Sequence, residues 1–135
     1  MLSSKKLKVF SRFVADLATL SKCEERDVAA IALNKKGTQI YSIGINGGPA
    51  GGVQCLCKTD TKYGCVHAEA QCIAKNTSTD ENKIMICSLS PCVTCATLII
   101  NSGFTEVYYI ERWKDVAGLE LLLKAGVKTY QIGGI

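Results

Sequence analysis

Residues 83–101 read KIMICSLSPCVTCATLIIN, and this stretch decides the fold because it joins a strand to a helix. The largely apolar run at residues 83–88 predicts a strand. Residues 92–101 predict a helix, because Pro91 stands just before the first turn and Gly103 follows the last residue, where it fits a C-terminal cap.

Working outward toward the C-terminus, the same alternation continues. Residues 106–110 and 128–132 predict strands, and residues 115–124 predict a helix that Gly126 ends. The second half of the chain therefore runs strand, helix, strand, helix, strand. This order favours parallel pairing with right-handed crossovers.

Toward the N-terminus, apolar residues at helical spacing predict an amphipathic helix over residues 4–20. Two strands, at residues 28–33 and 39–45, predict a hairpin around the turn Asn34-Lys35-Lys36-Gly37. A glycine-rich loop then runs through residue 63, and residues 67–75 predict a helix. We therefore expect an α/β fold of three layers (α/β/α), with helices on both faces of a mixed five-stranded sheet, and a single domain over residues 1–135.

Composition narrows the class of protein further. Of 135 residues, 47% are hydrophobic, which is enough for a buried core, yet no apolar run approaches the roughly 20 residues of a membrane span. No segment resembles a signal peptide, so we expect a cytoplasmic protein that does not contact membranes. The net charge of +4 is a mild excess, and the dense basic stretch Lys5, Lys6 and Lys8 is interpreted as a solvated helix face. Both observations argue against a nucleic-acid partner.

Eight cysteines are the unusual feature of the composition. Without an export signal the thiols are expected to be reduced, so metal binding is a better interpretation than disulfides. The single histidine lies in His67-Ala68-Glu69, and Pro91-Cys92-Val93-Thr94-Cys95 follows 25 positions later. His67, Cys92 and Cys95 make three zinc ligands and leave one tetrahedral position for water, which is typical of catalytic rather than structural zinc.

Glu69 is not needed as a ligand and can reach that water instead. The pattern His-x-Glu with a later Pro-Cys-x-x-Cys matches the signature of zinc deaminases. In such a reaction Glu69 takes a proton from the water, passes it to ring nitrogen N3 of a cytosine-type base, and then protonates the leaving amino group. A zinc-stapled fold without chemistry would normally supply a fourth protein ligand and would not need Glu69.

The chain resembles the cytidine and deoxycytidylate deaminase superfamily, and most of all its dCMP deaminase branch, from about residue 7 to residue 132. Besides the two zinc motifs, the resemblance is carried by the segments Ser21-Lys22-Cys23, Gly44-Ile45-Asn46-Gly47, Leu98-Ile99-Ile100-Asn101-Ser102-Gly103 and Ala125-Gly126-Val127. It implies a Zn²⁺ cofactor held by His67, Cys92 and Cys95. It also implies catalysis by Glu69 and hydrolytic deamination of dCMP to dUMP with release of ammonia, a step that feeds thymidylate synthesis.

The same resemblance implies four substrate-binding residues. Asn46 matches a loop asparagine that contacts the nucleotide sugar, and Arg26 matches a position near the substrate phosphate. Ala68 belongs to the same segment as Glu69, and Arg112 is a second phosphate candidate. The alternatives are that Asn46 is a plain turn residue beside Gly47 and that Arg26 is a surface arginine at a strand start.

Further implications concern assembly and regulation. The resemblance implies a homo-oligomer, specifically a hexamer, and dCTP and dTTP as candidate effectors. The loop departs from the family at Ile45, where tyrosine is usual, and in Gly48-Pro49-Ala50. Cys72 and Cys87 are expected in the core. The remaining cysteines are either a second, closed zinc site or reduced buried thiols: Cys23, Cys55, Cys57 and Cys65.

Three other functions stay open at the level of sequence. The substrate could be another cytosine nucleotide or nucleoside, such as dCTP, cytidine or deoxycytidine. The chain could instead be a non-catalytic, deaminase-like zinc-binding regulatory module, although the intact Glu69 argues against this. Finally, it could act on cytosine in single-stranded nucleic acid, against which the 7% aromatic content argues.

Overall fold

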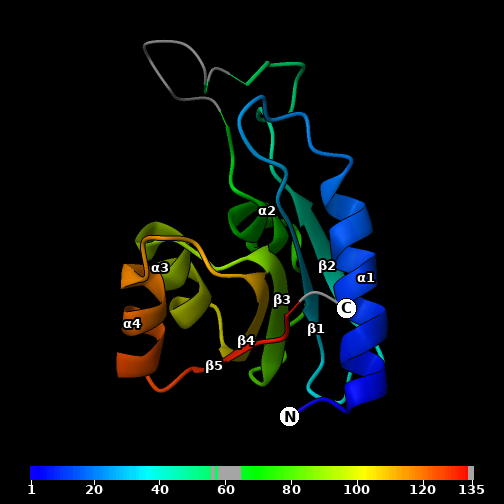
Figure 1. The fold of residues 1–135 in the computed structure, drawn as a ribbon, viewed down its shortest axis with the longest axis vertical. Coiled ribbons are helices and arrows are strands. Elements are labelled where there is room, and N and C mark those ends of the chain that lie inside the picture. The colour runs from blue at the N-terminus through cyan, green and yellow to red at the C-terminus, as the bar shows by residue number, and fades with distance from the viewer. Residues whose placement is uncertain (56, 58–64, 134–135) are drawn as a thin grey trace.

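The sheet of the protein has five strands in the order β2-β1-β3-β4-β5, as seen in a computed structural model that describes residues 1–55, 57 and 65–133 (Figure 1). β1 pairs antiparallel with both β2 and β3, whereas β3, β4 and β5 are parallel. The predicted mixed sheet is therefore confirmed. The strands are β1 (Ala29–Leu33), β2 (Ile40–Ile45), β3 (Lys83–Leu89), β4 (Phe104–Glu111) and β5 (Lys128–Gln131).

Helices cover both faces of this sheet, as expected for three layers. Helix α1 (Ser4–Ala18) lies on one face, and α3 (Val93–Asn101) and α4 (Ala117–Lys124) lie on the other together with α2 (Ala68–Lys75) (Figure 1). All of β1 is buried because its alternate side chains enter two cores. Ile31 packs under α1, whereas Ala30 faces α2.

All four helices are slightly shorter than the sequence pattern indicated, and α2 and α3 each begin one residue later than predicted. Helix α1 ends at Ala18 rather than residue 20. Helix α4 begins at Ala117 rather than residue 115, because the Asp115 carboxylate accepts the Ala117 backbone N–H at 3.0 Å and so caps the helix from outside it. Gly103 and Gly126 follow α3 and α4 with φ of 83° and 84°, which confirms their predicted capping role. The predicted glycine-rich loop through residue 63 lies partly outside the described residues.

Two glycines allow helices to pack directly on backbone at the end of the sheet where α2 and α3 begin. A Cβ at Gly44 in β2 would lie 1.9 Å from the Ala68 carbonyl oxygen of α2. A Cβ at Gly118 in α4 would lie 2.1 Å from the Pro91 carbonyl oxygen. Only glycine permits such approaches, so these positions fix where the N-termini of α2 and α3 stand.

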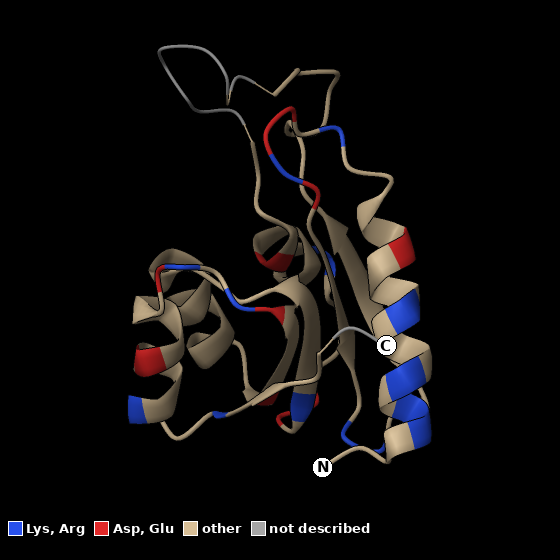
Figure 2. Cartoon of the chain, viewed as in Figure 1, with Lys and Arg blue, Asp and Glu red and all other residues tan. Residues whose placement is uncertain are grey.

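The charge distribution agrees with the interpretation of the basic N-terminal stretch. Lysine and arginine residues are concentrated along α1 (Figure 2), where Lys5, Lys8 and Arg12 are exposed. Among the helices of the described residues, none combines the length and the apolar character that crossing a membrane requires.

Candidate active site

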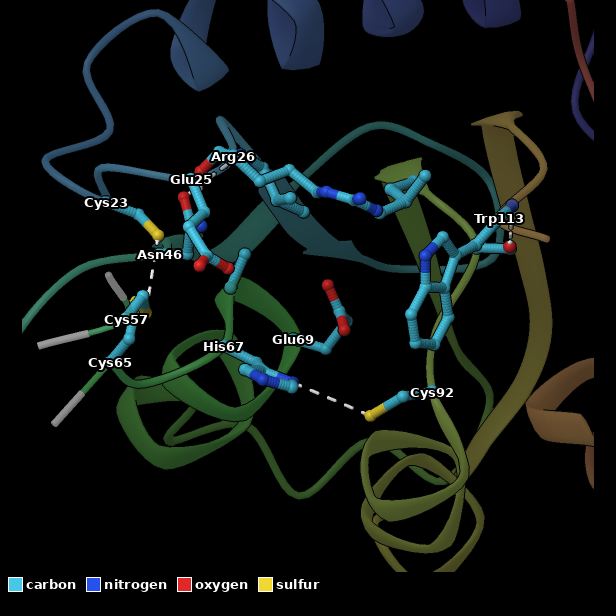
Figure 3. A pocket seen from close by; sticks show the side chains of 14 residues that line it. Cys23, Glu25, Arg26, Asn46, Cys57, Cys65, His67, Glu69, Cys92 and Trp113 are labelled. Carbon is cyan, nitrogen blue, oxygen red and sulfur yellow. Dashed lines mark hydrogen bonds between the residues drawn. The ribbon is translucent and has the colours of Figure 1, made fainter. Parts of the chain in front are cut away.

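Three predicted ligands come together between the first turns of two helices. His67 is the N-cap of α2, and Cys92 is the N-cap of α3. The Nδ1 atom of His67 lies 3.5 Å from Cys92 Sγ (Figure 3). The same nitrogen lies 3.4 Å from Cys95 Sγ. The backbone N–H of Cys95 points at Cys92 Sγ, at 3.5 Å.

These distances fit a zinc ion. Nitrogen and sulfur ligands bound at about 2.0–2.3 Å in a tetrahedron lie roughly 3.5 Å from one another. The three ligand atoms of His67, Cys92 and Cys95 all lie within 4.8 Å of one another. His67 is exposed at the cavity, so the side of the trio that faces the cavity is accessible to a small molecule.

The electrostatics of the trio also favour a cation. Hydrogen bonds from Cys95 and His67 lower the pKa of the Cys92 thiol to about 4. The hydrogen bond with the Cys92 sulfur, together with burial, raises the pKa of the Cys95 thiol. The negative charge on one thiolate thus disfavours ionisation of the second thiol. A divalent cation bound between the two sulfurs removes this repulsion.

Glu69 stands beside the trio on the first turn of α2. Its side chain is 4% exposed and points into the cavity between His67 and Trp113 (Figure 3). Burial raises the pKa of its carboxyl above the usual range, and contacts with Cys95 and His67 partly offset that effect. A buried carboxyl with a raised pKa is suited to accept and return a proton.

The cavity in front of Glu69 has a volume of about 260 Å³. It is bordered by His67, Ala68, Glu69 and Cys92 on one side and by Asn46, Arg26 and Trp113 on the other. Of the predicted substrate residues, Asn46, Arg26 and Ala68 therefore border the same cavity as Glu69. Arg112 does not border this cavity. It borders a neighbouring hollow, which Lys114 and Arg26 also line.

The Asn46 side chain is committed to the backbone in a way that neither sequence interpretation anticipated. Its Oδ1 accepts the Val28 N–H at 2.9 Å and the hydroxyl of Ser21, and its Nδ2 donates to the Arg26 carbonyl at 2.7 Å. Asn46 therefore holds the segment that carries Arg26. An asparagine amide has a second N–H, so a ligand contact remains compatible with this role.

Trp113, Glu25 and Ser90 also border the cavity, and sequence reasoning did not select them. Trp113 is the single tryptophan of the chain. Its place shortly after a parallel strand was the available signal, because ligands bind at the carboxyl ends of such strands.

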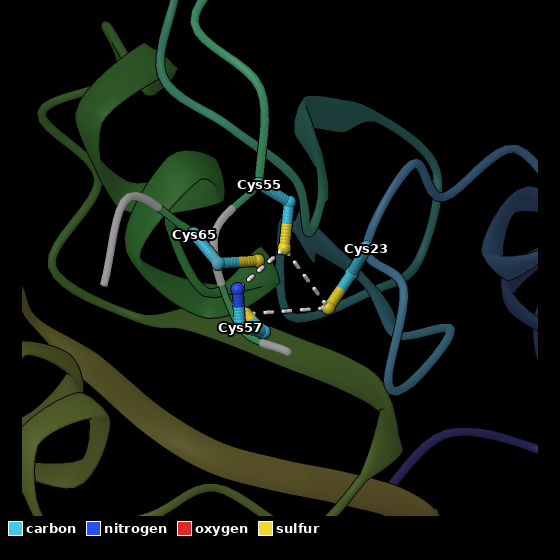
Figure 4. Close-up of side chains that lie close together, drawn as sticks. All are labelled: Cys23, Cys55, Cys57 and Cys65. Atoms are coloured by element: carbon cyan, nitrogen blue, oxygen red, sulfur yellow. Dashed lines mark hydrogen bonds between the residues drawn. The ribbon is translucent and has the colours of Figure 1, made fainter. Parts of the chain in front are cut away.

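A second cluster of cysteines lies beside the cavity. Cys23 Sγ is 3.7 Å from both Cys55 Sγ and Cys57 Sγ, and the ligand atoms of all four cysteines, with Cys65, lie within 4.8 Å of one another (Figure 4). Four thiolates around one zinc, each at about 2.3 Å, lie roughly 3.75 Å apart. The geometry thus fits a closed Cys₄ centre.

The thiols of this cluster shift one another's pKa values, as Cys92 and Cys95 do. Hydrogen bonds from Cys57 lower the pKa of Cys55 to about 7, whereas Cys55 and burial raise the pKa of Cys57 to about 12. Burial and the neighbouring sulfurs also raise the pKa of Cys65. Without a cation the cluster accommodates few thiolates at neutral pH, and with one it can hold all four. Cys72 and Cys87 lie apart from both groups in the apolar core, as predicted.

Together, these observations describe an α/β protein in which His67, Cys92 and Cys95 form a candidate three-ligand metal site. The family model described as "Cytidine and deoxycytidylate deaminase zinc-binding region" matches residues 4–111, and the chain belongs to this zinc-binding family.

Individual relatives agree with this assignment. The deoxycytidylate deaminase of Mus musculus is 37% identical over 128 residues, which cover 84% of this chain and 71% of that protein. The deoxycytidylate deaminase of Schizosaccharomyces pombe is 28% identical over 138 residues and 90% of this chain, but the chain spans only 42% of that protein's length.

The fold is shared with a crystal structure of dCMP deaminase from the cyanophage S-TIM5 in complex with dCMP and dUMP. The TM-score is 0.87 at 22% identity, over 98% of this chain and all of that one. This likeness confirms the expected deaminase-like α/β/α fold.

Proposed function

We propose that this chain is a zinc-dependent hydrolase that deaminates dCMP to dUMP and releases ammonia. The observation that carries the proposal is the buried Glu69 carboxyl beside the His67, Cys92 and Cys95 trio, in one cavity that Arg26 also borders. The trio accounts for the metal, Glu69 for proton transfer, and Arg26 for a negatively charged substrate group.

In this mechanism His67, Cys92 and Cys95 hold a zinc ion, which when bound supplies a Lewis acid that makes water a nucleophile near neutral pH. Glu69 accepts the proton of the attacking water and delivers it to N3 as the new C4–O bond forms. The same carboxyl then takes the proton of the new C4 hydroxyl and delivers it to the amino nitrogen, so the C4–N bond breaks, the C4 carbonyl forms and ammonia leaves. Burial of Glu69 suits this double role because it keeps the carboxyl easy to protonate.

Recognition of the nucleotide is assigned to the opposite wall of the cavity. The Arg26 guanidinium offers a planar fork for the phosphate, and its side chain is exposed toward the cavity. Asn46 would support the sugar through its remaining N–H, and Ala68 would line the base. Arg112 serves best as a secondary attraction for phosphate, since it borders the adjoining hollow rather than the Glu69 cavity.

The proposal includes a structural zinc in the cluster of Cys23, Cys55, Cys57 and Cys65. Such an ion would tie the segment before Arg26 to Cys65, two residues before His67. It would thereby hold both walls of the cavity together.

The direct test is an ultraviolet assay of the zinc-loaded protein with dCMP, dCTP, CMP and deoxycytidine in parallel. Preference for dCMP supports the proposal in full. Preference for deoxycytidine assigns a nucleoside substrate and removes the role of Arg26, whereas preference for dCTP assigns a triphosphate. No turnover of any of the four contradicts the proposed reaction and favours the regulatory-module alternative.

A homo-oligomeric state, specifically a hexamer, regulation by dCTP and dTTP, and a cytoplasmic location stay predictions. Light scattering of the purified protein measures the oligomeric state. The dCMP assay with and without each triphosphate measures the regulation. Fractionation of the producing cells measures the third.

A further inference from the structure

Trp113 is held at a fixed place on the cavity wall by its backbone. Its N–H donates to the Ser90 hydroxyl at 2.8 Å, and the Ser90 N–H donates to the Glu111 carbonyl at 2.9 Å. Ser90 is 3% exposed and directly precedes Pro91 and Cys92. The Trp113 backbone is therefore fixed relative to the segment that carries Cys92, although the indole takes no part in the proposed proton transfer.

Arg26 precedes β1 and Trp113 follows β4, two strands that lie on either side of β3, and the two side chains meet at the cavity. Its guanidinium carbon lies 5.8 Å from the centroid of the Trp113 ring, within the range of a cation–π contact (Figure 3). Within the part of the chain that the structure describes, no carboxylate lies within 4.0 Å of the guanidinium. Its N–H groups are consequently not committed to an ion pair there.

The backbone of Arg26 is fixed as well, because its carbonyl accepts the Asn46 amide at 2.7 Å. The residue is thus held at two points, by Asn46 at the main chain and by Trp113 at the side chain. A long side chain held in this way loses less conformational entropy when it binds an anion.

Arg26 and Trp113 both border the Glu69 cavity and the neighbouring hollow that contains Arg112 and Lys114. Among the described residues, the interaction found for the guanidinium is its cation–π contact with the Trp113 ring. We propose that Trp113 is a positioning residue that holds Arg26 over the Glu69 cavity and thereby sets the preference for a nucleoside monophosphate over the nucleoside. This inference rests on the proposed function, because it assigns the anion to the substrate phosphate.

The test compares Trp113→Leu, which removes the aromatic face, with the matched control Trp113→Phe, which keeps one. Turnover of dCMP and deoxycytidine is measured for both variants and for Arg26→Gln. We expect Trp113→Leu to lower the dCMP-to-deoxycytidine ratio of kcat/KM by about three- to tenfold, mainly through KM for dCMP, and Trp113→Phe to restore most of it. Adding Trp113→Leu to Arg26→Gln should lower the ratio no further, because both changes remove the same contact.

An equal loss on both substrates would overturn the inference, because it would show that the indole only shapes the cavity or supports the fold. Full additivity with Arg26→Gln would overturn it too. Zinc content and melting temperature of each variant identify a loss of folding. If Trp113→Leu does not fold, the inference is tested by comparing the dCMP-to-deoxycytidine ratio of Trp113→Phe with that of the wild type.

A second readout separates this inference from the proposed function. Trp113 is the only tryptophan, so its fluorescence reports this wall alone. Inorganic phosphate should change the emission of the wild-type protein and leave that of Arg26→Gln unchanged. If the protein does not turn over dCMP but this response is present, the proposed function fails while the Arg26–Trp113 anion site stands; if the response is absent, the inference fails.

Discussion

At the scale of single residues, the site depends on ionisable groups whose pKa values differ from those in water. The pKa of Cys92 falls to about 4 because hydrogen bonds with Cys95 and His67 stabilise its thiolate. The pKa of Glu69 rises because its carboxyl is buried. A thiolate that can hold a metal and an easily protonated carboxyl, both on the wall of one cavity, suit metal-assisted hydrolysis.

Replacing Glu69 by glutamine tests the carboxyl alone. Glu69→Gln keeps the size of the side chain but cannot relay a proton, so we expect kcat for dCMP to fall by about 10²–10⁴-fold. Zinc content should remain at the wild-type value, since Glu69 is not a ligand in the proposed centre. Glu81→Gln, a change at an exposed glutamate, is the control. Comparable turnover by wild type and Glu69→Gln would rule out the proton relay.

The core cysteines should be chemically silent in the native protein. Cys72 and Cys87 are both 0% exposed, and burial raises the pKa of Cys72 to about 11 and that of Cys87 well above its usual range. Because the thiolate is the reactive form, iodoacetamide at pH 8 should leave both unmodified until guanidinium unfolds the chain. Mass spectrometry of the labelled peptides measures this. Native labelling of Cys87 as fast as that of Cys23 in metal-free protein would contradict the described core.

At the scale of elements, the site exists because two helices begin at the same end of the sheet. α2 starts after His67 and α3 starts after Cys92, and each N-terminus rests on a neighbouring element through a glycine. Gly44 seats α2 on β2, and Gly118 seats α4 on the Pro91–Cys92 backbone. The ligand distances are thus set by helix-to-backbone contacts, which tolerate little change.

Gly44→Ala tests this seating. The new Cβ would lie 1.9 Å from the Ala68 carbonyl oxygen, so α2 must shift and carry His67 and Glu69 with it. We expect a loss of about 3 kcal/mol in the free energy of unfolding and a large loss of activity. Gly47→Ala is the matched control, because its nearest neighbouring atom would be 3.8 Å away. Denaturant unfolding and the dCMP assay measure both variants; equal behaviour of the two would contradict the tight contact.

At the scale of the whole molecule, two thiol-rich centres connect parts of the chain that are far apart in sequence. The trio joins α2 to α3, and the four-cysteine cluster joins Cys23 to Cys55, Cys57 and Cys65. Both open onto the same cavity, which is bordered by Cys23, Cys57 and Cys65 as well as by His67 and Cys92. Metal binding at the second centre is thus expected to stabilise the walls of the first.

Metal analysis distinguishes the two centres. We expect two zinc ions per chain, one of which is lost in Cys55→Ser and the other in Cys92→Ser. Cys55→Ser should lower the melting temperature, because a closed zinc site contributes to folding. Cys92→Ser should abolish turnover with a smaller effect on melting. One zinc per wild-type chain, unchanged by Cys55→Ser, would show that the cluster holds reduced thiols only.

Much of the fold could be predicted because its signals are local. The apolar run at residues 83–88 and the alternation that follows it gave the parallel half of the sheet, and the turn at Asn34 gave the hairpin of β1 and β2. Helix ends were less predictable: Asp115 caps α4 from outside, and a side-chain cap of this kind has no periodicity.

By itself, the sequence determined the order of elements and the metal-ligand motif, because hydrophobic periodicity and ligand spacing are properties of contiguous residues. Only the tertiary structure decided that Arg112 borders a different hollow from Glu69, that Asn46 holds the Arg26 backbone, and that Trp113 faces the Arg26 guanidinium. These contacts join residues 20 to 87 positions apart, as the pairs Arg26–Asn46 and Arg26–Trp113 show. Which of them form depends on how strands pair and helices pack, and no local pattern records that.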